Sequence, residues 1–518
     1  MLSFSEKIDE YLEWKLANYQ PKEPRSGKII HDNIWGTNYF NKWEIALIDN
    51  PLIQRLRNIH QTGLAFFTFP SATHNRFCHS LGVAIQVENL IQSLNKGNEV
   101  ISPEEKNVLR SAALLHDIGH GPFSHISEEM YKYLPAFRNE YLKNQAFSVK
   151  PKPHEVLGYL IINSSYFQER ILKKINIPGL SANSELLGNS IIGKVNDRMS
   201  AYKVELINGS FDADKLDYIL RDGVASGLPL RLDLERLWFS ISVKESDFEY
   251  SEGEQKIHAK ELVVNKNSVG ILEQIVFNKM NLFMSFYHHQ KIRAAECMYK
   301  SIIEYIQDKG YIFKIKKNGR TKEISFYDPI DFLYFDDNFF LTEYMDHFIE
   351  DPQLNYLVEK LKNRQLWVRA AVIEYNTIDT SNDIPGKNTR DSKLEALRNL
   401  PVKTKMYEKH SLNELRILTE EIYKIVKKKH SNCLKNEIWI DVPNSPSFTD
   451  SVKMFIDEKN EAENVKSLND YFRADVWADQ YKTNKYKISV FCPLVYRDDV
   501  KEAVKEVLKD KFEIEVKK

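Results

Sequence analysis

Helical periodicity is the feature that most constrains the fold of this chain. Across most of residues 40–235, apolar side chains recur three and four positions apart, as in 81–94 and 104–119. This spacing places them on one face of an α-helix. The sequence Ser102-Pro103-Glu104-Glu105 is typical of a helix start, because a capping residue is followed by proline and acids. We therefore expect a mainly α fold.

Strands are expected in fewer places. Residues 238–266 alternate in polarity around a turn at Ser251–Glu254, which predicts a β-hairpin. Residues 311–327 predict a second hairpin that turns at Asn318-Gly319. One long helix is expected between them, from 268 to 308, and further helical segments are expected over 329–363.

The last 120 residues or so read as an α+β region. We expect helices at 411–429 and 497–512 and strands at 436–443, 452–458 and 485–493. The polar stretch 376–399 contains proline and glycine and is the predicted linker. The expected parts are therefore 1–310, 311–400 and 401–518.

Composition excludes several classes of protein. The chain has 518 residues, of which 42% are apolar, so it can bury a large core. A net charge of -1 gives no general attraction to nucleic acid or anionic lipid. No apolar run approaches the roughly 18 residues of a membrane span. The acidic start lacks a signal-peptide core, and four scattered cysteines suit a reducing compartment. We expect a cytoplasmic protein with no membrane attachment and no nucleic acid as its main ligand.

Histidines are unevenly distributed. Six of the 14 lie in one stretch, namely His74, His79, His116, His120, His125 and His154. In the densest segment, 114–125, an apolar helix is expected to end at His116-Asp117. Imidazole and carboxylate together suit a divalent ion such as Mn, Fe, Ni, Zn or Mg. Further ligands are available from His79 and from Asp212, Asp214 or Asp217. Helix-capping acids and surface histidines are the alternative, but three such segments in this order favour a metal site.

The pattern H…HD…D resembles the HD phosphohydrolase superfamily. The strings at 54–63, 69–82, 116–125 and 212–222 are more narrowly similar to its dNTP triphosphohydrolase branch, which includes the dGTPases, and the similarity covers about residues 28–300. The resemblance implies an HD-type helical catalytic domain in 1–310. The helical extension expected in 311–400 and the α+β domain expected in 401–518 rest on the sequence pattern alone. The resemblance also implies one divalent metal, with further Mg on the nucleotide phosphates. The implied ligands are His79, His116, Asp117 and Asp214, whereas Asp212 and Asp217 would cap the helix or pair with cations.

The implied reaction converts a dNTP and water into a deoxynucleoside and triphosphate. His125 matches the proposed acid of the family, and Glu128 and His154 match the residues that orient it. The family usually has Asp at position 128, so the longer Glu changes the details of this arrangement. The implied substrate contacts are Arg76, His120 and Lys215 at the phosphates, Tyr218 and Asp222 at the sugar, and Gln61 at the 3′-hydroxyl.

One substrate position departs from the family. The phosphate-binding arginine of the family falls at Met280, with Lys279 beside it, and a pocket tyrosine falls at Tyr287–His288. Methionine cannot bind phosphate, so either Lys279 substitutes or the substrate is not an ordinary dNTP. Alternatively, the helical spacing from Met280 to Tyr287 marks an apolar core stripe that includes Phe283 and Met284.

A second group matches an activating-nucleotide site of the family, namely Lys28, Asp49, Gln54 and Arg57. The resemblance implies a GTP or dNTP effector at a subunit interface and therefore a homo-oligomer, whether dimer, tetramer or larger. The same residues are also explained by helix packing and salt bridges, and both interpretations stay open. Two other functions also stay open. One is an HD phosphohydrolase for a nucleoside monophosphate, a modified nucleotide or a cyclic nucleotide, and the other is a non-catalytic nucleotide sensor.

Overall fold

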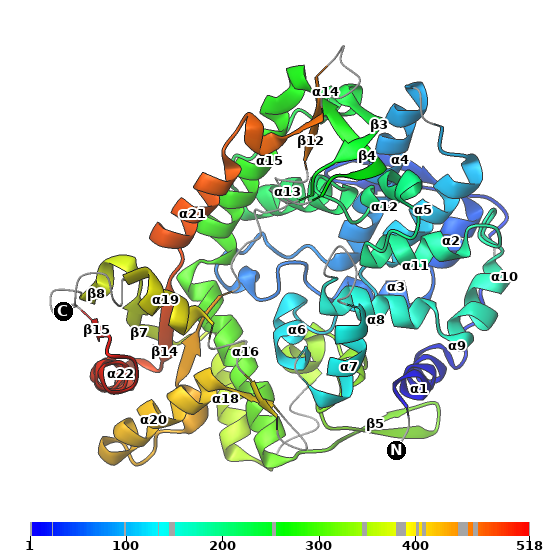
Figure 1. The fold of residues 1–518 in the computed structure, drawn as a ribbon. Coiled ribbons are helices and arrows are strands. Elements are labelled where there is room, and N and C mark those ends of the chain that lie inside the picture. The colour runs from blue at the N-terminus through cyan, green and yellow to red at the C-terminus, as the bar shows by residue number, and fades with distance from the viewer. Residues whose placement is uncertain are drawn as a thin grey trace.

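The computed structural model describes residues 3–22, 24–97, 100–132, 134–144, 151–250, 255–343, 350–379, 390–399, 404–406, 411–443, 454–458 and 465–516. The fold is mainly helical, as predicted (Figure 1). Among the helices of these segments, none is both long enough and apolar enough to cross a bilayer.

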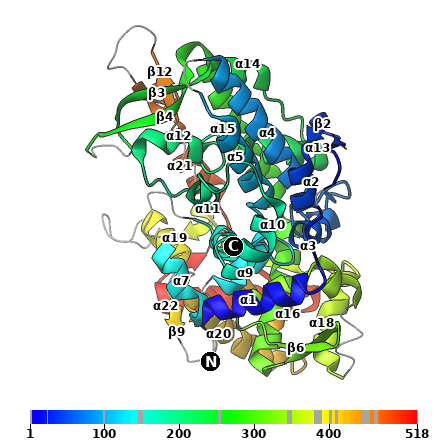
Figure 2. The same ribbon diagram turned by 90° about the vertical axis from the view of Figure 1, so that its right-hand side faces the viewer.

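Helices are the main elements of the first 240 residues. Figure 2 shows α1 lying across the lower half of the molecule, with α4 and α5 above it. The α4 helix packs against both α5 and α13. The helices are α1 (Phe4–Leu16), α2 (Lys42–Ile48), α3 (Pro51–Arg55), α4 (Arg76–Lys96), α5 (Pro103–Leu115), α6 (His125–Tyr131), α7 (Pro135–Asn144), α8 (Pro153–Ile162), α9 (Ser165–Phe167), α10 (Lys173–Ile175), α11 (Ser184–Ile192), α12 (Ala201–Glu205), α13 (Ala213–Ser226) and α14 (Leu234–Ser240).

The predicted start of α5 is confirmed. The Ser102 hydroxyl accepts the Glu105 N–H at 3.2 Å, and the Glu105 carboxylate accepts the Ser102 N–H at 3.0 Å. This reciprocal capping box satisfies two amides at the start of the helix. The helix ends at Leu115, with His116 as its C-cap. The His116-Asp117 pair therefore lies at a helix end, as the sequence indicates.

The single helix expected over 268–308 is wrong. The chain forms α15 (Val269–Leu282), a π-helical turn (Phe283–Tyr287) and a separate helix, α16 (Gln290–Lys309). His289 has an extended backbone and caps α16, so the helical path is interrupted before it. The wider turn changes the direction in which side chains leave the backbone, and it orients Tyr287 toward the site described below.

Both predicted hairpins are confirmed, although the turn at Ser251–Glu254 lies outside the described residues. Strands β3 (Ile241–Phe248) and β4 (Ile257–Asn265) pair antiparallel, as do β5 (Phe313–Lys317) and β6 (Arg320–Ile324). Asn318 and Gly319 both have positive φ, at 51° and 75°, as a tight hairpin turn requires. An earlier hairpin, β1 (Lys28–Asp32) with β2 (Gly36–Phe40), was not predicted.

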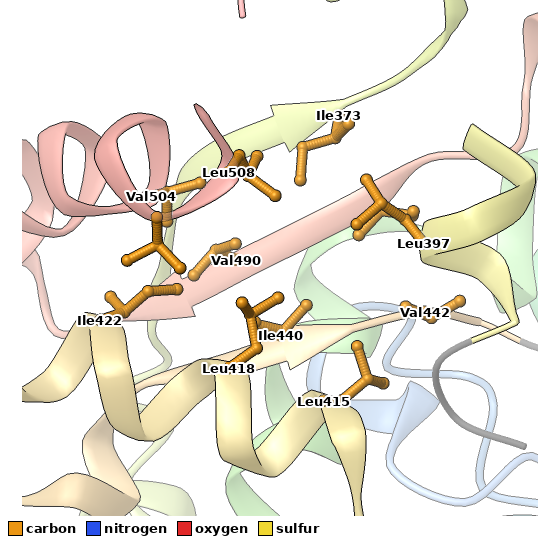
Figure 3. A pocket seen from close by; sticks show the side chains of 12 residues that line it. Ile373, Leu397, Leu415, Leu418, Ile422, Ile440, Val442, Val490, Val504 and Leu508 are labelled. Carbon is orange, nitrogen blue, oxygen red and sulfur yellow. The ribbon is translucent and has the colours of Figure 1, made fainter. Parts of the chain in front are cut away.

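The C-terminal region forms a three-stranded antiparallel sheet in the order β11-β14-β7. Its strands are β7 (Val368–Ile373), β11 (Trp439–Asp441) and β14 (Ile488–Cys492), and β7 was not predicted and precedes residue 401. Aliphatic side chains from the strands and from α19 (Arg390–Arg398), α20 (Glu414–Lys429) and α22 (Arg497–Phe512) converge on one apolar gap (Figure 3). The predicted linker 376–399 thus contains a helix, and its residues 380–389 lie outside the described part.

Part of the C-terminal region reaches back to the first half of the chain. Strand β12 (Phe455–Asp457) pairs in parallel with β4, and β13 (Val465–Ser467) completes a sheet in the order β13-β12-β4-β3. Phe472 and Trp477, the latter on α21 (Ala474–Asn484), pack around Phe277 of α15. The remaining helices and strands after α16 are α17 (Pro329–Leu333), a π-helical turn (Phe339–Glu343), α18 (Pro352–Lys362), β8 (Ile378–Asp379), β9 (Thr404–Met406), β10 (Ser411–Asn413) and β15 (Glu515–Val516).

Candidate active site

Four side chains from three helices meet at the end of α5. His79 on α4, and His116 and Asp117 after α5, offer ligand atoms that all lie within 4.8 Å of one another. Asp214 of α13 joins them, because its Oδ1 is 2.9 Å from His79 Nε2. All but Asp214 are buried. We call these four residues the HD centre; they are the same four that the sequence predicts as metal ligands.

The histidines of the HD centre are oriented by their outer nitrogens. His79 Nδ1 donates to Asp217 Oδ2 at 2.7 Å, and His116 Nδ1 donates to the Ala113 carbonyl at 2.7 Å. Each inner Nε2 lies against a carboxylate: His79 Nε2 is 2.9 Å from Asp214 Oδ1, and His116 Nε2 is 3.2 Å from Asp117 Oδ1. Within the described part of the chain, neither nitrogen makes a well-aligned hydrogen bond. Two buried imidazole nitrogens that face carboxylates in this way fit a divalent cation.

Asp212 and Asp217 support the HD centre but are not among its four residues. Asp217 is fully buried and pairs with Arg221, with Nε to Oδ2 at 2.8 Å, while it holds His79. A Cβ on Gly82 would lie 1.9 Å from Asp217 Oδ1, so only glycine at this position of α4 lets the carboxylate approach. Asp212 caps α13 and pairs with Lys215 Nζ at 2.7 Å. These are the capping and pairing roles expected for the two acids.

Electrostatics keep the carboxylates of the HD centre ionised. Burial opposes the charge of Asp117, but Arg76 and His116 hold its pKa well below the usual range. Burial likewise opposes the charge of Asp214, whose pKa is lowered by His79 and Lys152. Burial lowers the pKa of His116, which favours the neutral ring that metal binding needs. Burial also opposes the charge of His79, but Asp214 and Asp217 raise its pKa to about 10, so a bound cation would displace a proton from this ring.

A second group lies next to the HD centre. His120, His125, Glu128 and His154 also bring ligand-type atoms within 4.8 Å of one another, and we call them the Glu128 cluster. One oxygen, Glu128 Oε1, accepts from His125 Nδ1 and from His154 Nδ1, both at 2.9 Å. The side chain of His125 is 57% exposed, whereas Glu128 and His154 are buried. The exposed ring is therefore fixed on one side by an anion and open on the other.

His120 lies between the two groups. Its ring stacks on His154 with centroids 3.7 Å apart, and its Nε2 is 3.3 Å from Asp117 Oδ1. Burial, together with the charges of Arg76 and His154, lowers the pKa of His120 to about 3. His120 is therefore neutral at ordinary pH.

A loop with a strained backbone precedes α6 and sets the direction in which the helix starts. Phe123 and Ser124 have φ values of 54° and 59°, although neither is glycine. Such residues cost about 1–3 kcal/mol each and persist only where the surroundings enforce them. Here Asp337, which is fully buried, accepts the Phe123 N–H at 2.6 Å. The same carboxylate accepts His60 Nδ1 at 2.6 Å, so it joins this loop to the turn before Gln61. Sequence reasoning missed Asp337.

Arg76 contacts both the HD centre and the loop. Its NH1 donates to Asp117 Oδ1 and Oδ2 at 3.0 and 2.9 Å, and its Nε donates to Ser124 Oγ at 2.9 Å. Its NH2 is buried and makes no hydrogen bond to the described residues. The guanidinium therefore has a donor left for an anion that enters the site.

The predicted sugar-side residue Asp222 is buried and held by two partners. His74 Nε2 donates to its Oδ1 at 2.7 Å, and the Tyr287 hydroxyl donates to its Oδ2 at 2.5 Å. Of the two positions offered for the pocket tyrosine, Tyr287 thus contacts Asp222, whereas His288 contacts Tyr481. Sequence reasoning left His74 without a role. Gln61 is buried, and Tyr218 is half-buried on α13.

The cations expected at the phosphates differ in their surroundings. Lys215 Nζ contacts Asp212 and the Gly209 carbonyl, each at 2.7 Å. Met280 is 6% exposed and belongs to the apolar core, whereas Met284 of the proposed stripe is 38% exposed. Lys279 is half-buried on α15. Sequence reasoning missed Lys152, whose side chain is 51% exposed and whose charge interacts with those of Asp214 and Lys215.

The four predicted effector residues are only partly brought together. Gln54 Oε1 accepts Arg57 Nε at 2.8 Å, and the Arg57 guanidinium lies 3.6 Å from the centre of the Phe77 ring. Lys28 and Asp49 are exposed, and in the described part of the chain no hydrogen bond or ion pair joins them to this pair. The Gln54–Arg57 contact agrees with helix packing and leaves an effector role as a proposal.

Comparison with known proteins places these residues in a family context. Residues 76–200 match the HD domain. The chain is 29% identical to an uncharacterized protein of Methanocaldococcus jannaschii. The match spans 350 residues and covers 67% of this chain and 60% of the relative. It is 28% identical to the protein YwfO of Bacillus subtilis, over 52% of this chain and 53% of the relative.

A third relative has a named activity. The chain is 29% identical over 315 residues to deoxynucleoside triphosphate triphosphohydrolase SAMHD1 of Homo sapiens, which covers 58% of this chain and 47% of the relative. Over these matches the chain spans between about half and three fifths of the length of each relative. The HD domain and the relatives agree with the resemblance seen in the sequence.

Proposed function

We propose that this chain, whose residues 76–200 form an HD domain, is a metal-dependent phosphohydrolase that converts a deoxynucleoside triphosphate and water into a deoxynucleoside and triphosphate. The observation that supports it most is that the buried inner nitrogens of His79 and His116 face the carboxylates of Asp117 and Asp214. The Glu128 cluster next to them supplies an exposed histidine. The similarity to SAMHD1 supports the class of substrate.

The HD centre would hold one divalent ion through His79, His116, Asp117 and Asp214. When bound, such an ion lowers the pKa of a water molecule and polarises the phosphate that the water attacks. The protein's own contribution is to hold both histidine rings in the correct orientation, through Asp217 and the Ala113 carbonyl. Further Mg would accompany the nucleotide phosphates.

His125 would act as the general acid. The water oxygen forms a bond to the α-phosphorus while the bond from phosphorus to the 5′-oxygen breaks. The 5′-oxygen is a poor leaving group unless it is protonated. Because His125 Nδ1 donates to Glu128, its Nε2 is the nitrogen that can deliver this proton. Glu128 stabilises the imidazolium form, and His154 fixes Glu128 from the other side.

Substrate recognition would follow from the remaining contacts. A triphosphate carries about four negative charges and needs cations around it. Arg76 has a donor available, Lys215 would supply a second positive charge, and the neutral His120 would donate a hydrogen bond to a phosphate. The buried Asp222 with Tyr287 would meet the deoxyribose together with Tyr218, and Gln61 would meet the 3′-hydroxyl. A snug contact there would exclude ribonucleotides.

Two lysines are candidates for the positive charge that the family's phosphate-binding arginine supplies at the position of Met280. Met280 is buried in the core, and on the dNTP interpretation a cation at this position would come from Lys279 or from Lys152. We expect Lys152→Met to raise KM by roughly tenfold with little change in kcat, because it removes one exposed charge near Asp214. Lys279→Met is the matched comparison. A rise in KM in the Lys279 variant alone would assign the phosphate contact to that residue.

The proposal is tested by identifying the products. Metal-loaded protein is incubated with each dNTP, with and without GTP; phosphorus-31 NMR follows the phosphate product and liquid chromatography follows the deoxynucleoside. We expect triphosphate and deoxynucleoside in equal amounts, and their loss after chelation and in Asp117→Asn. If no dNTP yields triphosphate with Mn or Mg under any of these conditions, the proposal fails.

The buried Met280 favours a second candidate, which is hydrolysis of another nucleotide. With fewer cations, the pocket would suit a nucleoside monophosphate, a modified nucleotide or a cyclic nucleotide. Release of orthophosphate from a monophosphate, or opening of a cyclic ring, with no triphosphate formed from any dNTP, selects this candidate.

An activating nucleotide is a further part of the proposal. Gln54 and Arg57 would contact a GTP or dNTP effector together with Lys28 and Asp49, at an interface between copies of the chain. GTP should then raise both the rate of dNTP hydrolysis and the oligomer mass measured by light scattering. Arg57→Ala should remove both effects, and activation that persists in this variant would leave these residues with a packing role only.

A further inference from the structure

The α16 helix lies between α6 and the C-terminal sheet (Figure 1). Lys300 reaches to both sides from its middle. Its Nζ is 2.8 Å from Glu129 Oε2 on α6 and 3.6 Å from Asp441 Oδ1 on β11. Lys300 is 5% exposed, and the Trp439 ring, also on β11, lies 5.9 Å from its amine. The buried Lys300 amine thus joins α6, the helix that carries His125 and Glu128, to the C-terminal strand β11.

The strand side of this link is rigid. Asp441 is 2% exposed and accepts both Arg293 Nε and Arg293 NH2, at 2.9 and 2.7 Å. A bidentate pair of this kind fixes direction as well as distance. Arg293 also contacts Glu296, and burial raises the pKa of Glu296 to about 7, against the charges of Arg293 and Lys300. The positive charges of Arg293 and Lys300 are therefore balanced chiefly by the carboxylates of Asp441 and Glu129.

On the α6 side, the Lys300 contact adds to apolar packing, since Ile126 and Tyr131 are 5% and 0% exposed. The α6 helix has seven residues, and a helix this short is not stable on its own. It carries His125 and Glu128 in its first turn, after the strained Phe123–Ser124 loop. On the face toward α16, Ser127 Oγ lies 3.0 Å from the Tyr299 hydroxyl, next to the Lys300 contact. Two adjacent residues of α16, Tyr299 and Lys300, thus contact the same face of α6.

We propose that Lys300, backed by Asp441, is a positioning residue for the general acid, and that the C-terminal region sets the rate of the reaction through it. Lys300 does not touch the substrate. It fixes α6 so that the His125 ring and Glu128 keep their geometry. The catalytic consequence rests on the proposed function, whereas the structural consequence can be measured without any activity.

The first experiment measures amide hydrogen exchange over residues 125–131 in the full-length, metal-loaded protein. Lys300→Met should speed exchange in α6 by at least about fivefold, because Glu129 loses its buried partner. Lys435→Met is the matched control. Lys435 also links α16 to the C-terminal region, at 3.7 Å from Glu304 and 3.4 Å from Asp308, but these two residues lie on α16 and not on α6. Equal exchange of α6 in Lys300→Met and wild type overturns the proposal.

Kinetics separate positioning from binding. In Lys300→Met, kcat should fall by roughly 10-fold to 100-fold, as when reacting groups are misplaced by about 1 Å, while KM and metal content stay unchanged. Lys300→Arg should recover most of the rate, because it restores a cation to Glu129. A fall in kcat accompanied by loss of metal, or equal loss in Lys435→Met, contradicts the positioning role.

A milder variant covers the case in which Lys300→Met does not fold. Glu129→Gln removes the same ion pair from a side chain that is 23% exposed, and it should also loosen α6 and lower kcat. If wild-type protein hydrolyses no nucleotide, the proposed function fails while the exchange measurement still decides the link. Unchanged exchange in Glu129→Gln overturns the link itself.

Discussion

At the scale of single residues, the histidines of the site are oriented by the groups that bind their outer nitrogens. His79 is turned by Asp217, His116 by a helix carbonyl, and His154 by Glu128. In each case the outer nitrogen is occupied, so the inner one is defined. Outer partners of this kind set ligand orientation and basicity.

This arrangement predicts a strong effect of Asp217 on metal binding. Asp217→Asn should weaken metal affinity by about 10-fold to 100-fold, because the amide cannot hold His79 in the same way. Metal content after dialysis against graded chelator measures it. Asp212→Asn is the control, since asparagine caps a helix well and Asp212 does not contact either histidine of the HD centre. Equal metal loss in both variants would contradict the role given to Asp217.

The Glu128 cluster predicts a pH effect with a defined sign. Desolvation lowers the pKa of His125, and the Glu128 carboxylate opposes that shift. The acid works only when protonated, so kcat/KM falls as pH rises through this pKa. Glu128→Gln removes the opposing anion and should move the alkaline limb of the kcat/KM profile to lower pH. Glu128→Asp keeps the charge and should leave the limb near its wild-type position. A limb that stays in place in Glu128→Gln removes the acid assignment from His125.

At the scale of elements, the loop before α6 depends on Asp337. Its carboxylate holds Phe123 in a backbone conformation that the residue does not favour. Asp337→Asn should weaken this clamp by about 1.5–3 kcal/mol, the worth of a hydrogen bond to a charged group, and should lower kcat with metal content unchanged. Asp336→Asn is the neighbouring control, because Asp336 is only half-buried and bonds Asn58. Equal rates in both variants would contradict the clamp.

Local signals predicted those elements whose cause is local. The capping box of α5, the turn at Asn318-Gly319 and the HD pair at a helix end all follow from neighbouring residues. The π-helical turn before α16 follows from no such signal, because it contains neither glycine nor proline. The Asp337 clamp joins groups 214 residues apart in the chain, and no spacing in the sequence points to it.

At the scale of the whole molecule, the C-terminal region is not a separate appendage. Its strand β12 joins the β3–β4 hairpin, and Asp441 reaches the helix that supports α6. The sequence predicted β11, β12 and β14 but not which strands pair, since the parallel pairing of β12 with β4 joins residues about 190 positions apart. β7 was missed for the same reason: its partner lies far along the sequence.

The central claim is that water attacks the α-phosphorus of a dNTP at the HD centre. The most direct measurement is hydrolysis in water labelled with oxygen-18, with mass spectrometry of both products. The proposed reaction places one labelled oxygen in the triphosphate and none in the deoxynucleoside. Label in the 5′-hydroxyl of the deoxynucleoside, or in pyrophosphate or orthophosphate released in place of triphosphate, would contradict it.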